Sequence, residues 1–202
     1  MKKIPSYDNP FSEEFYKKDN FLFAVYDLDG KFLHLLGRLS KKHEKLKLGY
    51  IAQCGLVRFY KGFYYASDGY SGKIYCYNEY GNLIDSIKLF DEPMPMVPPI
   101  DKNKEPVRYL IETFKMNYSY WIKDFVITEN SCYLLLSDWD DEEAEVYQIS
   151  LKGDIKKRFI LPSKIEGKKV KPYILRKSKE GLKVISLLES SEETYYCEFI
   201  IP

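Results

Sequence analysis

The sequence has few of the residues that form metal or redox centres. Its 202 residues include two histidines, His34 and His43, and four cysteines, Cys54, Cys76, Cys132 and Cys197. No two cysteines are close enough to form a CxxC pair, and the histidines do not complete a zinc site at the usual spacing. Three of the cysteines lie in apolar runs that suggest strands, where a reduced Cys packs as a small hydrophobic residue. We therefore expect no metal site and no redox chemistry.

Long apolar runs and a net charge are also missing. No run approaches the roughly 18 apolar residues of a membrane-spanning helix. The start is basic but no apolar stretch follows it, so the sequence as it stands predicts a cytoplasmic protein. A periplasmic or extracellular location would follow if a signal lay upstream. With 31 basic and 30 acidic residues there is no net basic field, which argues against nucleic acid as a partner.

Motifs of common catalytic sites are absent as well. The sequence contains no P-loop, no GxSxG, no HExxH and no GxGxxG. No catalytic residue and no cofactor is therefore predicted.

Aromatic residues, by contrast, are abundant. There are 19 Tyr and 12 Phe. Flat, stiff side chains pack well on a pleated surface, so this composition favours a β-rich fold.

A repeat centred on glycine organises the chain. Residues 23–33, 74–84 and 146–156 each contain an apolar run, a short polar turn ending in Gly30, Gly81 or Gly153, and a second apolar run. Because glycine adopts the positive φ of a tight turn, each segment is typical of a β-hairpin.

The segments upstream of two of these hairpins also match, so the repeating unit has four strands. Complete units are predicted at 50–90 and 119–161, and partial ones at 21–37 and 170–202, all within a single domain of residues 1–202. Four-stranded units of about 40–50 residues are typical of β-propeller blades.

The residues from 56 to 87 resemble one NHL-type blade. The resemblance rests on Asp68 at a strand end, on residues 72–75, and on the turn at 77–83. The whole chain resembles the NHL and TolB-like six-bladed propellers of bacteria. This resemblance implies an all-β, incomplete propeller of about three to four antiparallel four-stranded blades with no substantial helix. Six blades would need roughly 240–300 residues, so open blade edges are expected, and these would allow a homodimer to form.

An insertion at 90–116 interrupts the repeat. Its prolines favour an extended, polyproline-like path, and it serves either as a connector or as a ligand-binding arm. The aromatic and methionine side chains in and near it, and in the acidic loop after the next hairpin, are the candidate binding residues: Met94, Met96, Tyr118, Tyr120, Trp121 and Trp139.

Two functions follow from these observations. The first is a non-catalytic binding module whose tyrosine-rich loops recognise a peptide, a protein or a carbohydrate. The alternative is a truncated part of a propeller enzyme, a metal-dependent hydrolase or lyase. The acidic loop from Asp138 to Glu143 is expected to be a strand-to-strand turn rather than a cation site, with the Asp138 carboxylate bonded to turn backbone.

Overall fold

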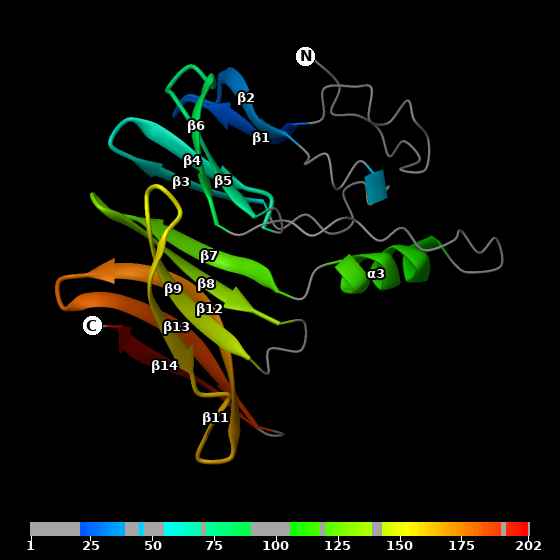
Figure 1. Ribbon diagram of the computed structural model, residues 1–202, viewed down its shortest axis with the longest axis vertical. Coiled ribbons are helices and arrows are strands. Elements are labelled where there is room, and N and C mark those ends of the chain that lie inside the picture. Colours follow the sequence, from blue (N-terminus) through cyan, green and yellow to red (C-terminus); the bar gives the residue numbers. More distant parts are fainter. Residues whose placement is uncertain are drawn as a thin grey trace.

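The computed structural model describes residues 21–38, 45–46, 55–69, 72–89, 106–117, 120–138, 143–190 and 193–201. Within these ranges the chain forms four antiparallel sheets and one helix of 12 residues (Figure 1). The prediction of an all-β fold is therefore confirmed.

The strands follow one another in chain order within each sheet. The first sheet is a hairpin of β1 (Phe21–Tyr26) and β2 (Phe32–Arg38). The second contains β3 (Leu56–Tyr60), β4 (Phe63–Ser67), β5 (Lys73–Tyr77) and β6 (Leu83–Lys88). The third contains β7 (Trp121–Ile127), β8 (Ser131–Ser137), β9 (Ala144–Ser150) and β10 (Ile155–Leu161). Both four-stranded meanders lie where the repeat predicts complete units.

The fourth sheet contains β11 (Lys164–Ile165), β12 (Lys168–Ser178), β13 (Gly181–Glu189) and β14 (Thr194–Ile201). The sequence predicts only its last three strands. The two-residue strand β11 pairs with β12 on the side away from β14. Among the described residues, no strand pairs with the other side of β14.

The helix α3 (Pro106–Asn117) lies in the insertion, where the prolines predict an extended path. A proline is tolerated at the first position of a helix because its missing N–H is not needed there. Tyr109, Thr113 and Asn117 are buried at a spacing of four residues, which places them on one helical face. The proline-rich part of the insertion, residues 90–105, lies outside the described residues.

The four sheets are stacked face to face in chain order (Figure 1). Apolar clusters fill each of the three interfaces. Leu36 of the first sheet packs with Ala66 and Tyr77 of the second. Ile74 and Ile87 of the second pack with residues of β7 and β8 in the third. Residues of β8 and β9 in turn pack with Leu175 and Val184 of the fourth. Burial of this apolar area is the main stabilising contribution to the stack.

The pleat of β8 explains how one strand serves two interfaces. Cys132 and Leu134 belong to the cluster shared with the second sheet, whereas Leu135 belongs to the cluster shared with the fourth. Successive side chains of a strand point to opposite faces of its sheet. Because both faces are covered, residues 132–136 are apolar or aromatic without a break.

One five-residue turn closes three of the hairpins. Asp27, Asn78 and Ser150 occupy its first position, and each side-chain oxygen accepts hydrogen bonds from the N–H groups two and four residues later. The N–H of the glycine in the fourth position donates to the backbone carbonyl of the first residue at 3.0–3.1 Å. The side-chain and backbone bonds together explain why Asp, Asn and Ser are the residues found at this position.

The glycines of two of these turns also lie against the preceding sheet. A Cβ on Gly81 would lie 2.7 Å from Cδ2 of His34 in β2, and a Cβ on Gly153 would lie 2.0 Å from the carbonyl oxygen of Lys88 in β6. Gly30 has the same turn, with nothing within 4 Å of such a Cβ. The glycines at 81 and 153 are therefore required both for positive φ and for close approach of neighbouring sheets.

A matched pair of substitutions separates these two requirements. Gly30→Ala introduces only the strain of positive φ, which costs about 1–2 kcal/mol. Gly153→Ala adds a clash with the backbone of β6, so we expect a total loss of about 3 kcal/mol or more in unfolding free energy. Urea unfolding of the two variants measures the difference. Equal losses would mean that the turn of the third sheet does not pack against β6.

Candidate functional site

Two of the six predicted binding residues lie in the described part of the chain. Tyr120 precedes β7, and Trp121 is its first residue. Met94, Met96, Tyr118 and Trp139 lie outside the described residues. The site is therefore built around Tyr120, Trp121 and their neighbours.

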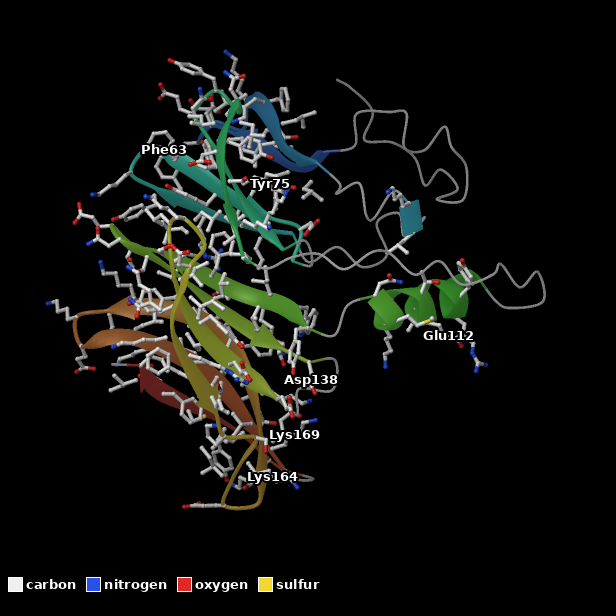
Figure 2. The ribbon with its side chains drawn as sticks, viewed as in Figure 1. Phe63, Tyr75, Glu112, Asp138, Lys164 and Lys169 are labelled. Carbon is white, nitrogen blue, oxygen red and sulfur yellow. The ribbon has the colours of Figure 1, made fainter. Side chains whose placement is uncertain are left out.

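These two aromatics lie at the end of the sheets where β3, β7 and β12 begin, which we call the entry end. In the third sheet, Trp121 of β7 pairs with Ser137 at the end of β8, which pairs with Ala144 at the start of β9. The loop between β8 and β9 therefore lies beside the start of β7. Figure 2 shows Asp138 and Lys169 on the same side of the third and fourth sheets.

Tyr120 is anchored to the acidic loop between β8 and β9. The residue is 40% exposed, and its hydroxyl donates a hydrogen bond to Oε2 of Glu143 at 3.0 Å. This hydrogen bond to the carboxylate, with smaller effects of burial and nearby acidic groups, raises the pKa of Tyr120. The tyrosine thus presents a rigid, partly exposed ring whose hydroxyl is held in place.

Asp138 closes the same loop. Its Oδ1 accepts a hydrogen bond from the N–H of Glu143 at 3.2 Å, and its own N–H donates to the Glu143 carbonyl at 3.0 Å. The predicted bond from the Asp138 carboxylate to turn backbone is confirmed. Within the described ranges, no group of three or more His, Cys, Asp or Glu side chains is placed to hold a metal ion.

A second anchored group lies nearby on β9 and β10. The guanidinium of Arg158 donates to both carboxylate oxygens of Glu145, with Nε to Oε2 at 2.7 Å. Bidentate pairing of this kind fixes the orientation of the two side chains relative to each other in addition to pairing their charges. The Arg158 hydrogen bond lowers the pKa of Glu145, so this carboxylate contributes stability at neutral pH that is lost as the pH falls through its folded pKa. Arg158 also lies 5.9 Å from the centre of the Tyr147 ring.

Trp121 is half-buried and is covered on one side by a lysine. Nζ of Lys123 lies 5.1 Å from the centre of a Trp121 ring, a distance typical of a cation–π contact. The next N–H in the strand, that of Ile122, donates to the carbonyl of Gly69 at 2.8 Å. This bond joins the loop after β4 to the start of β7, so the entry ends of the second and third sheets are held together.

The strands β3, β7 and β12 of three sheets lie side by side, because β7 contacts both β3 and β12. Asp124 of β7 connects them. Its carboxylate accepts hydrogen bonds from the Arg58 guanidinium of β3, from the N–H of Leu175 in β12 at 2.9 Å, and from its own neighbour Phe125 at 2.7 Å. Asp124 is 1% exposed. This carboxylate therefore joins three separate sheets.

Burial raises the pKa of Asp124, although Arg58 and the two backbone N–H groups favour the ionised form. A folded pKa above the unfolded one means that this carboxyl favours the fold most at acid pH. That contribution is lost as the pH rises through the folded pKa. The partners of Asp124 limit the loss but do not cancel it.

Sequence reasoning did not find Asp124, Arg58, Glu145 or Arg158. A signal for Asp124 exists, because it is an acidic residue inside the otherwise apolar second half of β7 and such a residue needs a partner when buried. The partner itself lies 66 residues away at Arg58. No local pattern identifies it.

The comparisons with known proteins assign no family. No family model and no curated protein matches the chain. One similar solved structure is a protein of unknown function from Bacteroides caccae, with 9% sequence identity and a TM-score of 0.42. The match covers 89% of this chain and 54% of that one, so this chain spans about half the length of that protein.

No helix within the described ranges is long and apolar enough to cross a membrane.

Replacing Arg58 tests the role of the buried carboxylate. Arg58→Met leaves ionised Asp124 with backbone donors only, so we expect the unfolding free energy at neutral pH to fall by about 2 kcal/mol. The variant also raises the folded pKa of Asp124 further. The loss should shrink as the pH falls toward about 4, the ordinary pKa of an aspartate carboxyl, because a carboxyl with a raised pKa takes up its proton before that pH is reached. Urea unfolding at the two pH values measures this.

The control is Lys61→Met, which removes the exposed pair between Lys61 and Glu129. Exposed ion pairs contribute little, so little change is expected at either pH. A loss in Arg58→Met that stays constant with pH would contradict the proposed role of the Asp124 charge.

Thiol labelling tests whether the cysteines of the strands are structural. Cys132 is fully buried, and burial raises its pKa far above the usual range of a thiol. We expect no reaction of Cys132 with a maleimide in the folded protein and full reaction in denaturant, located by mass spectrometry. The less buried Cys197 should react faster. Rapid native labelling of Cys132 would contradict a packing role.

Proposed function

We propose that the chain is a sector of a β-propeller and acts as a non-catalytic binding module, with its ligand at the entry end of the sheets around Tyr120. The observation that carries the proposal is the side-by-side placement of the strands β3, β7 and β12, with loops gathered at one end.

The radial arrangement of a propeller accounts for several features together. The second and third sheets run in chain order from β3 and β7, and β7 contacts β3 on one side and β12 of the fourth sheet on the other. The last strands are more exposed: in β6 only Ile87 is buried, and in β10 only Leu161. Inner strands packed together and outer strands facing solvent are expected of propeller blades around a central axis.

The entry end offers the kind of surface that binding loops use. The partly exposed ring of Tyr120 provides a flat apolar surface, and its hydroxyl is already bonded to Glu143. Rigid aromatic side chains with a polar tip lose little conformational entropy on binding, which makes them frequent in binding surfaces. The bidentate pair of Glu145 and Arg158 adds fixed polar groups on the same sheet. A peptide, a protein or a carbohydrate is the ligand class suited to this combination.

A screen against immobilised peptides and glycans tests the proposal. A ligand bound by the wild-type protein should lose at least tenfold in affinity with Tyr120→Ala, since an aromatic anchor at a binding surface contributes about 1–3 kcal/mol. Tyr80→Ala is the matched control, because Tyr80 is 71% exposed on the turn between β5 and β6. The Tyr80→Ala variant should bind the ligand with the affinity of the wild-type protein.

A second variant lacking residues 91–106 tests the contribution of the insertion. Loss of binding in this variant and in Tyr120→Ala would support one site formed by both segments. Binding that survives both changes, or that is lost equally in Tyr80→Ala, would refute a site at the entry end.

A further inference from the structure

The outer edge of the fourth sheet differs from the outer edges of the other sheets. In the second and third sheets the third strand is covered by a fourth, β6 or β10. Counted from β12, the strand of the fourth sheet that contacts β7, β14 is the third strand, and among the described residues it pairs only with β13. Within the described ranges, the other edge of this eight-residue strand has no strand beside it, and alternate residues direct their backbone N–H and C=O groups toward that edge.

Charge distinguishes these edges further. Edge strands are commonly protected from pairing by charged side chains. The outer strand β10 carries Lys156, Lys157 and Arg158, and β6 carries Asp85 and Lys88. The sequence of β14 is TYYCEFII, with Glu198 as its single charge.

That one charge has a partner on the neighbouring strand. Nζ of Lys183, on the neighbouring strand β13, lies 3.0 Å from Oε2 of Glu198. The remaining residues of β14 are aromatic, β-branched or otherwise uncharged, a composition with high strand propensity. Tyr196 is 82% exposed and Ile200 is 55% exposed, both on the face that points away from the third sheet.

From these observations we infer that β14 is a homodimer interface, in which the β14 strands of two copies pair antiparallel about a two-fold axis. Such pairing is isologous, which means that the same strand edge of each copy contacts that of the other. It satisfies the open backbone groups of both copies and joins two fourth sheets into one continuous sheet.

The two-fold axis also restricts the register. Residues directly opposite each other must lie on the same face of the joined sheet, so the axis passes through a residue position rather than between two residues. The longest overlaps place the axis at Cys197 or at Glu198. An axis at Glu198 would set two carboxylates opposite each other, which is destabilising. An axis at Cys197 instead sets Tyr196 opposite the Glu198 of the second copy.

This register yields a charge-sign test at a single exposed position. In the Tyr196→Glu dimer, the new carboxylate of each copy lies opposite Glu198 of the other copy. Two like-charge pairs result, so the dissociation constant should rise by about tenfold or more. In the Tyr196→Lys dimer, the ammonium group of each copy lies opposite Glu198 of the other copy, so the dimer should be retained or strengthened. Because the side chain is exposed in the single chain, neither change should disturb the fold, which circular dichroism checks.

Sedimentation velocity over about 1–100 µM protein gives the readout, since a short strand pair supports a dissociation constant in about this range. The control is Ala24→Glu, at an exposed position of the uncharged strand β1, and its dissociation constant should match that of the wild type. A monomeric wild-type protein throughout this range would overturn the proposal. So would equal effects of Glu and Lys at position 196, or a dimer weakened by Ala24→Glu.

Discussion

A buried carboxylate links one strand from each of three sheets, and the stack depends on it. Asp124 is bonded to the Arg58 guanidinium of β3, to the Leu175 N–H of β12 and to backbone of its own strand. Apolar packing between sheets is non-directional, so it alone would let one sheet slide over the next. A buried charge requires its partners in fixed positions because leaving it unpaired is costly. The carboxylate therefore sets how β3, β7 and β12 lie relative to one another.

Close backbone approach provides a second constraint, farther from the first strands. The turn glycines Gly81 and Gly153 lie against β2 and β6 of the preceding sheets, at distances that leave no room for a Cβ. Each complete sheet is thus held near its first strand by polar bonds and near its last strands by steric fit. Between these two constraints the apolar clusters fill the interfaces. Together these contacts place the loops of the entry end, with Tyr120 and Glu143, in a fixed arrangement.

Local patterns predicted most of the secondary structure. The positions of the hairpins follow from alternating apolar residues and from the glycine of a five-residue turn, which are properties of short stretches of chain. The helix α3 was missed because the prolines before it dominate the composition of the insertion, although Pro106 is suited to a first helical position. For the candidate site, Tyr120 and Trp121 were proposed because they are aromatic residues that follow the insertion. Their partners Glu143 and Lys123 were not, since a turn and a bulged strand bring them into place.

The sequence by itself determined the all-β class, the four-stranded repeat and the residue types of the turns, because each depends on neighbours within about ten residues. Only the tertiary structure decided which strands of different sheets meet. It brings Arg58 to Asp124 across 66 residues, sets Gly153 against Lys88, and leaves the nearly uncharged β14 at an outer edge. These pairings depend on how whole sheets stack, and stacking is governed by summed burial and shape rather than by any local pattern.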